Sequence, residues 1–169
     1  MLTKVVSVTN FGLKAVEIEV EVNVADKGFP AFGIVGIASK SSEEIKERVR
    51  TAITNTDIEF PVAKVIANLA PADLPKDGSG YDLPIAVGIL ASMSELVLPK
   101  SKSYFYGELS LDGSLRHTKG VFLLAILARE QGVKNIFVPR LCANEASVIE
   151  GVNVYPVDNL RSLIKHLRG

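Results

Sequence analysis

Residues 70–90, APADLPKDGSGYDLPIAVGIL, contain the residue types that nucleophilic catalysis requires. Ser79 stands between two glycines and follows an Asp-Gly pair. A serine nucleophile needs a base within hydrogen-bond reach, and a lysine can be that base where burial lowers its pKa. Lys76 and Lys119 are the candidate lysines. The segment therefore predicts either a hydrolase site or a loop that only resembles one.

Metal chemistry has weaker support. His117 and His166 lie far apart and show neither His-x-x-x-His nor His-x-Glu spacing, so a histidine metal site or a Ser-His pair is disfavoured. His166 is expected on the surface near a helix C-terminus. Asp73, Asp77 and Asp82 do not have the spacing of a calcium loop, and helix caps and turn contacts are the preferred interpretation.

Nucleotide-binding motifs are also missing. The chain has no Gly-x-x-x-x-Gly-Lys-Ser/Thr, and GSGYDL has Leu83 where the dinucleotide fingerprint has its last glycine. Cys142 is the only cysteine, which excludes an internal disulfide and a cysteine-cluster zinc site, and it is expected to be a semi-buried free thiol. No cofactor or metal is predicted within these residues.

Composition indicates one domain over residues 1–169. The chain is 47% hydrophobic, enough for one well-buried core, and its 19 basic residues balance 19 acidic ones. This balance removes any global attraction to nucleic acid or an anionic membrane. The N-terminus lacks signal-peptide features and no apolar run is long enough to span a bilayer, so a soluble cytoplasmic protein without membrane contact is expected.

The first half of the chain predicts strands around one helix. Residues 16–24, VEIEVEVNV, alternate strictly between apolar and polar, which indicates a half-buried antiparallel strand. Residues 2–8, LTKVVSV, are expected to pair with it through the turn TNFG. AFGIVG, residues 31–36, predicts a third strand, and KVIANLA, residues 64–70, predicts a buried one.

Two helices are expected beside these strands. Ser41 and Glu44 form a capping box, which predicts a helix from about Ser42 to Asn55. Asp82 is expected to cap the next helix, with Pro84 in its tolerant first turn. The apolar positions are Ile45, Val49, Ala52 and Ile53 in the first helix and Ile85, Val87, Ile89 and Leu90 in the second.

The second half alternates strands and helices. YFYGELSLDGSLRHT predicts two strands about the turn Asp112-Gly113, and a helix from about Gly120 to Gln131 should end at Gly132. NIFVP and NVYPV predict strands, CANEASVIE a short helix, and NLRSLIKHLR a final helix. The order indicates an α+β fold, a mixed sheet with helices mainly on one face.

Three collinear blocks resemble a known family. FPAFGIVGIASKSSEEIKERVRTAI, FPVAKVIANLAPADLPKDGSGYDLPIAVGIL and GELSLDGSLRHTKGV are similar to the N-terminal domain of the ComM/YifB family, the magnesium chelatase-like AAA+ ATPases. This resemblance implies a ribosomal protein S5 domain 2-like fold, which the Lon proteolytic domain and the RadA C-terminal domain share. His117 stands where the family pattern has proline, so the turn there is expected to differ.

The resemblance also implies a function. The whole protein would be a hexameric ATP-dependent motor, a helicase that promotes DNA branch migration in recombination, with ATP and Mg²⁺ bound in an AAA+ module beyond Gly169. This chain would be its non-catalytic N-terminal domain, with the AAA+ module and further copies as partners and DNA as a possible one. Alternatives are a chelatase-type subunit that remodels a metal-insertion partner, and a purely structural oligomerisation module.

Comparison with Lon-type proteases tests the catalytic interpretation of the loop. The nucleophile position falls on Gly80, one residue after Ser79, and the catalytic lysine position falls on Phe122. Phe122 cannot take a proton and is expected to pack in the core. Because nucleophilic catalysis needs both partners in contact, a divergent Lon-like peptidase is disfavoured.

We call residues 76–82 the signature loop; it consists of Lys76, Asp77, Gly78, Ser79, Gly80, Tyr81 and Asp82. Gly78 and Gly80 allow positive φ, and Asp77 with Asp82 could bind backbone N–H groups on either side. The loop is either a shaped surface for a neighbouring subunit or module, or a rigid strand-to-helix connection; the second is slightly preferred.

A candidate nucleic-acid patch lies on the first helix. It consists of Lys40, Lys46, Arg48 and Arg50. Glu43, Glu44 and Glu47 alternate with these cations at spacings that form intrahelical pairs, so a solvated helix face is the preferred interpretation.

Overall fold

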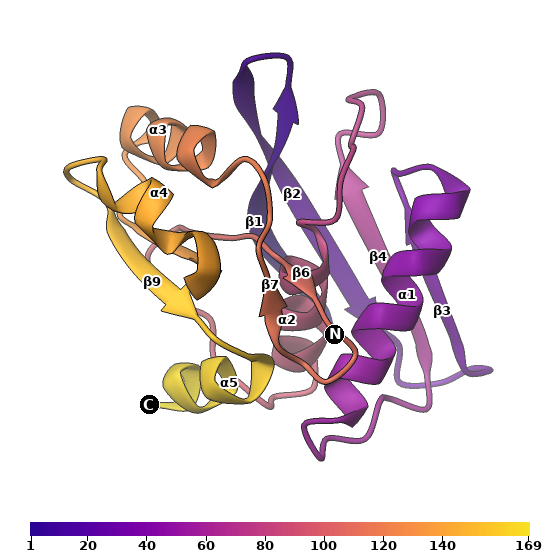
Figure 1. The fold of residues 1–169 in the computed structure, drawn as a ribbon. Helices are drawn as coiled ribbons and strands as arrows, with labels where there is room; N and C mark the ends of the chain where they lie inside the picture. Colours follow the sequence, from indigo (N-terminus) through magenta and orange to yellow (C-terminus); the bar gives the residue numbers. More distant parts are fainter.

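The computed structural model describes residues 1–169 and places seven strands in one mixed sheet (Figure 1). Their order across the sheet is β3-β4-β2-β1-β5-β8-β9. The bounds are β1 Leu2–Phe11, β2 Lys14–Val24, β3 Ala31–Val35, β4 Lys64–Ala70, β5 Ser103–Phe105, β8 Asn135–Pro139 and β9 Asn153–Val157. A separate two-stranded hairpin is formed by β6 Glu108–Leu109 and β7 Leu115–Arg116.

Five α-helices complete the fold, which confirms the mixed α+β class. They are α1 Ser39–Thr54, α2 Asp82–Ser92, α3 Val121–Gln131, α4 Ala143–Ser147 and α5 Leu160–Arg168. A short 3₁₀ turn, η1 Arg140–Cys142, precedes α4. None of these helices has both the length and the apolar character needed to cross a membrane.

Strand β1 lies at the centre of the sheet and joins two kinds of pairing. It pairs antiparallel with β2 on one side, as predicted, and parallel with β5 on the other. Beyond β2 the pairing is antiparallel to β4 and then parallel to β3, and beyond β5 it continues parallel through β8 and β9. The sheet is therefore entirely parallel from β1 through β9, whereas the β2 side of β1 contains both antiparallel and parallel pairs.

The larger hydrophobic cluster lies on the face covered by α1, α2 and α5. Alternation in β2 directs Ile18, Val20 and Val22 to this face, where all three are buried. Helix α2 packs so closely on β2 that a Cβ at Gly88 would lie 2.5 Å from Val22 Cγ2, so glycine is required there.

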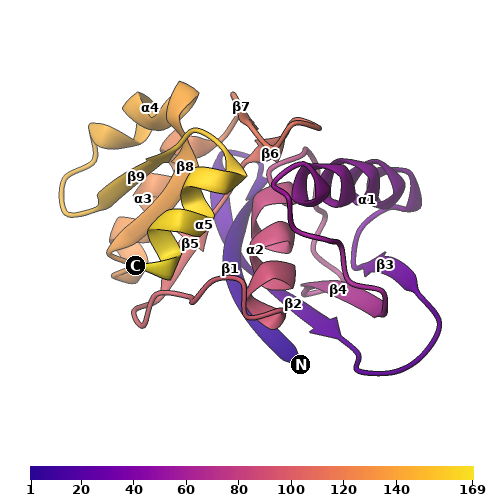
Figure 2. The same ribbon diagram turned by 90° about the horizontal axis from the view of Figure 1, so that it is seen from below.

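A second cluster covers the opposite face near β8. It contains Val8, Tyr104 and Ile136 from the sheet, with Leu124 and Ala125 from α3, and it extends to α4. Helices α1, α2 and α5 therefore lie on one face of the sheet, as expected, and α3 and α4 lie on the other (Figure 2). Strands β5 and β8 contribute residues to both clusters, so this part of the sheet is covered on both faces. Parallel strands usually require such double cover.

The start of α1 differs from the prediction. The helix begins at Ser39, its N-cap is Ala38, and no side chain caps it, so the Ser41–Glu44 capping box is wrong. Gly36, with φ +88°, turns the chain directly from β3 into the helix, three residues earlier than expected. Ser42 lies within the helix, where its hydroxyl donates to the Ile34 carbonyl (3.3 Å).

Several turns follow the sequence signals. Gly113 and Gly132 have φ of +91° and +71°, and Gly132 is the C-cap of α3, as predicted. The hairpin between β1 and β2 turns at Gly12 and Leu13, because β1 continues through most of the predicted TNFG turn to Phe11 and β2 begins at Lys14. The region around Asp112 contains three strands rather than two, since β5 leaves to join the main sheet.

Candidate functional site

The signature loop connects β4 to α2 and is fixed at its start by Lys76. This residue is 7% exposed, and its ammonium donates to the carbonyls of Gly36 (2.8 Å), Pro71 (2.5 Å) and Leu74 (3.0 Å). Burial lowers the pKa of Lys76. Its three donors are all engaged with backbone carbonyls, so it ties the loop to the turn that follows β3.

Tyr81 closes the other end of the loop beneath the central strand. Its buried hydroxyl donates to the Asp77 carbonyl (2.9 Å) and shares a hydrogen bond with the Thr9 hydroxyl (2.6 Å). Burial raises the pKa of Tyr81. The phenol thus holds the loop to β1, a contact that no sequence pattern had indicated.

Gly80, where the sequence resemblance to Lon-type proteases predicts the nucleophile position, has no room for a side chain. A Cβ there would lie 2.1 Å from Cε1 of the Tyr106 ring. The ring is held in place because its hydroxyl donates to the Lys119 carbonyl, and the Gly80 carbonyl accepts from the Gly107 N–H (2.9 Å). Glycine is therefore required by close packing rather than by its φ.

Ser79 is half-buried and has no catalytic partner. No side chain donates to or accepts from its hydroxyl, although its carbonyl accepts a long bond from the Asp82 N–H (3.4 Å). Gly78 beside it adopts φ +89° with open space around it, as the turn prediction requires. Of the two candidate bases, Lys76 directs its ammonium to the three carbonyls described above, and Lys119 is exposed.

Asp82 joins three elements instead of capping α2, so the capping prediction is wrong. Its buried carboxylate accepts from Arg48 Nε (2.6 Å) and Nη2 (3.1 Å) in α1, and from the Leu109 N–H (2.9 Å) in β6. The N-cap of α2 is Tyr81, without a side-chain cap. Burial raises the pKa of Asp82 to about 6, while Arg48 acts in the opposite direction.

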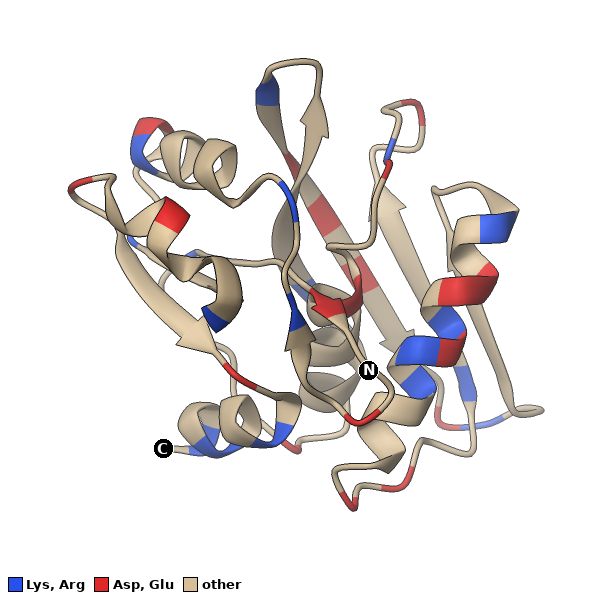
Figure 3. Cartoon of the chain, in the orientation of Figure 1, with Lys and Arg blue, Asp and Glu red and all other residues tan.

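The four cations of the candidate nucleic-acid patch have different environments. Arg48 turns inward to Asp82, Lys46 pairs with Glu43 (2.6 Å), and the Arg50 guanidinium lies over two aromatic rings. Those rings are Phe32 (5.8 Å) and Phe60 (5.4 Å). Lys40 is exposed and has no ion pair. Figure 3 shows basic and acidic residues alternating along α1.

Four other candidate residues lie outside the loop. Phe122 is 43% exposed, so the core-packing prediction is wrong; the buried residues of α3 are Val121, Leu124, Ala125 and Ala128. Cys142 is free, as expected, but fully rather than partly buried. His117 is exposed, and its Nε2 lies 3.0 Å from Glu145 Oε2. His166 lies on the surface, as predicted.

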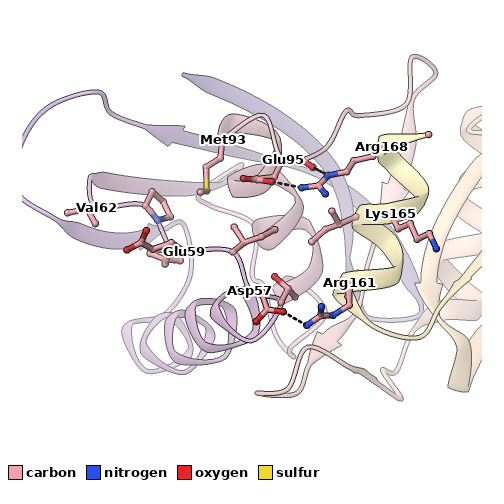
Figure 4. Close-up of a pocket in the computed structure, with 14 residues that line it drawn as sticks. Asp57, Glu59, Val62, Met93, Glu95, Arg161, Lys165 and Arg168 are labelled. Carbon is pink, nitrogen blue, oxygen red and sulfur yellow. Dashed lines mark hydrogen bonds and ion pairs between the residues drawn. The ribbon is translucent and has the colours of Figure 1, made fainter.

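A cleft that the sequence did not predict lies between α5 and residues 56–62 (Figure 4). Its volume is about 860 Å³, and it is crossed by two ion pairs, Arg161–Asp57 (3.1 Å) and Arg168–Glu95 (2.5 Å). Its lining also includes Ile58, Glu59, Phe60, Met93, Ile164 and Lys165. Three segments that lie far apart in the sequence form the cleft, so no single stretch of the sequence predicts it. The one pattern visible in the sequence is the recurrence of basic residues along α5, at Arg161, Lys165 and Arg168.

Metal chemistry has no donor set in this structure. No group of three or more histidine, cysteine, aspartate or glutamate side chains is placed to hold an ion. Asp73, Asp77 and Asp82 do not converge, because Asp82 is buried against Arg48 while the other two are exposed.

Sequence comparison now defines the class of protein. Residues 20–141 match the family described as Subunit ChlI of Mg-chelatase, and the chain belongs to that family. It is 38% identical to Competence protein ComM of Haemophilus influenzae over 99% of its length, and 40% identical to the uncharacterized protein YifB of Escherichia coli over 94%. The chain spans only 33% and 31% of those relatives.

A more distant relative connects the chain to a protease. This chain is 28% identical to Lon protease 1 of Borreliella burgdorferi over 94% of its own length. The matched region covers 21% of that protease. The resemblances to the ComM/YifB family and to Lon proteases that the sequence blocks indicated are thereby confirmed.

Proposed function

We propose that this chain is the non-catalytic N-terminal domain of a ComM/YifB-like AAA+ ATPase. Its relatives are about three times as long, which leaves room for a motor module that would bind ATP and Mg²⁺. The fold would be of the ribosomal protein S5 domain 2-like type, in keeping with the Lon similarity. The complete protein would be cytoplasmic and hexameric, and would drive DNA branch migration during recombination.

The observation that carries the non-catalytic role is the packing of Tyr106 against Gly80. A serine at that position would place its Cβ 2.1 Å from the ring, and the lysine position is occupied by Phe122. Nucleophilic catalysis needs a nucleophile and a base in contact, and neither aligned position supplies one. The anchored loop instead offers a rigid surface to a neighbouring module.

The motor proposal is tested with the full-length protein. We expect ATP hydrolysis that increases on addition of branched DNA, and movement of a four-way junction that requires ATP. Residues 1–169 alone should show neither activity. Full-length protein whose ATP turnover ignores DNA would contradict the proposal.

Two alternatives have specific support and separate outcomes. The family description favours a chelatase-type subunit, which predicts ATP turnover that responds to a porphyrin and a metal-insertion partner rather than to DNA. The Lon similarity favours a divergent peptidase, which predicts that a serine-reactive fluorophosphonate labels wild type but not Ser79→Ala. We expect no such label, because nothing activates the Ser79 hydroxyl.

A further inference from the structure

Strand β3 is an open edge of the main sheet. It pairs with β4 on one side, and no strand pairs with it on the other (Figure 1). The Ala31 N–H donates to the Ala63 carbonyl on the β4 side (3.2 Å). Because alternate residues of a parallel strand bond to the same neighbour, the backbone groups of Phe32 and Ile34 point away from the sheet. Both offer an N–H and a carbonyl to another strand.

This edge lacks two of the usual protections against pairing, a charged side chain and a proline within the strand. Residues 31–35, AFGIV, contain no charge and no proline, whereas natural edge strands are commonly blocked by lysine or proline. The opposite edge, β9, shows the contrast: Asn153 N–H donates to the Lys134 carbonyl, so Val154 and Pro156 point outward. Proline has no N–H, so the outer side of β9 offers only one donor.

Apolar side chains beside β3 are also uncovered. Phe29, just before the strand, is 91% exposed, and Val35 at its end is 50% exposed. The Ser42 hydroxyl occupies one lone pair of the outward Ile34 carbonyl and leaves the second available. Hydrogen-bonding groups and apolar surface therefore coincide at one edge.

We propose that two copies of this chain pair through their β3 strands, antiparallel, about a twofold axis at Gly33. In this register Phe32 of each copy forms a hydrogen-bonded pair with Ile34 of the other, and all four outward-pointing groups of each strand are used. Gly33 faces its own symmetry mate in a non-hydrogen-bonded position, where strands approach most closely and an absent side chain helps.

The same register brings complementary residues together. Ala31 lies opposite Val35 of the second copy, and pairing these two exposed residues removes apolar surface from water. A strand without charge also creates no repulsion across the axis.

Twofold pairing is independent of the proposed motor function. A ring is built from head-to-tail contacts, whereas this contact is isologous and uses the same patch on both copies. The pairing could join two rings or two free domains. Failure of the dimer would leave the motor proposal unchanged, and failure of the motor proposal would leave the dimer unchanged.

Sedimentation velocity provides the first test. We expect wild-type residues 1–169 to show a reversible monomer–dimer equilibrium between roughly 1 and 100 µM, a range typical of modest interfaces. Val35→Lys should be monomeric throughout, because it places a lysine beside each end of the pair. Val148→Lys, also at an exposed valine (69%), is the matched control and should dimerise like wild type.

Cysteine cross-linking tests the register. Residues 31 and 35 lie opposite each other across the pair with Cα atoms about 4.5 Å apart, which allows a disulfide, whereas residue 31 and its own symmetry mate lie roughly 14 Å apart. Mixing Ala31→Cys with Val35→Cys under mild oxidation should yield roughly tenfold more covalent dimer than either variant alone. Buried Cys142 keeps the wild-type background low.

Three results would overturn the proposal. A wild type that stays monomeric at about 100 µM excludes self-pairing. A Val35→Lys variant that dimerises like wild type places the contact elsewhere on the surface. Equal cross-linking of single and mixed cysteine variants rejects the register. Circular dichroism of each variant confirms that it is folded.

Discussion

Gly80 carries the tightest steric constraint in the signature loop. Its neighbour Gly78 also lies in that loop, with φ +89° and no atom within 4 Å of a Cβ built there. The two glycines are therefore required for different reasons, one by packing against Tyr106 and the other by backbone conformation. This difference allows the two contributions to stability to be measured separately.

We expect Gly80→Ala to lower the free energy of unfolding by about 3 kcal/mol, because the Tyr106 ring must move from a buried site. Gly78→Ala is the control and should cost about 1 kcal/mol, from strain at positive φ alone. Urea denaturation of the two variants makes the comparison. Equal losses of unfolding free energy in the two variants would mean that the Tyr106 ring moves at little energetic cost and that position 80 can hold a side chain.

Asp82 provides a pH-dependent prediction at the same scale. Its pKa is about 6 in the folded chain, against 3.8 for an unperturbed aspartate, so the folded state holds a proton more tightly. The stability from this group is thus full below pH 3.8 and is lost as pH rises through 6. From about pH 5 to pH 7, wild type should lose about 1 kcal/mol relative to Asp82→Asn, measured by urea denaturation. A difference that is constant with pH would contradict the raised pKa.

Helix α3 shows what determines burial at the scale of an element. Its sequence is apolar over VFLLAILA, yet only Val121, Leu124, Ala125 and Ala128 are fully buried. These positions follow the i, i+3, i+4, i+7 spacing of one helical face, and Phe122 lies off that face. Phase along the helix, rather than hydrophobicity, decides which residue belongs to the core.

Two substitutions in α3 test this assignment. Leu124→Ala should lower the free energy of unfolding by about 3 kcal/mol, because it leaves a cavity in the second hydrophobic cluster. Phe122→Ala should cost less than about 1 kcal/mol, since 43% of its surface is already exposed. Thermal denaturation compares them. A larger loss at Phe122 would restore the core assignment that the structure overturns.

Local signals predicted the elements better than they predicted the contacts between them. Alternation in residues 16–24 and the glycine at 132 identified β2 and the end of α3, because both signals act through neighbouring residues. The roles of Asp82 and Gly80 could not be found this way. Arg48 and Tyr106, their partners, are 34 and 26 residues away, and sequence alone does not indicate such pairs.

The whole molecule joins its two hydrophobic clusters through one sheet. Val20 lies in the larger cluster and Leu124 in the smaller, and both are completely buried. Because β1 contributes side chains to both clusters, with Val5 on one face and Val8 on the other, neither can lose its packing alone. The chain should therefore unfold as one cooperative unit.

This cooperativity is tested by placing one cavity on each face. Val20→Ala and Leu124→Ala should each shift the whole transition, with far-ultraviolet circular dichroism and tyrosine fluorescence giving the same midpoint. Each should cost about 2–3 kcal/mol. Separate midpoints for the two probes in either variant would show that the halves of the sheet unfold independently.

The central position of β1 has a consequence for the nascent chain. Val6 pairs with Glu19, which is synthesised soon after it, but the parallel partner of Val6 on the other side is Tyr104. At roughly 5–20 residues per second, a ribosome needs on the order of 5–20 s to supply that second strand. During this interval one side of β1 has no partner, so the growing polypeptide presents a hairpin with open hydrogen-bonding groups that other chains or a chaperone can occupy until β5 emerges.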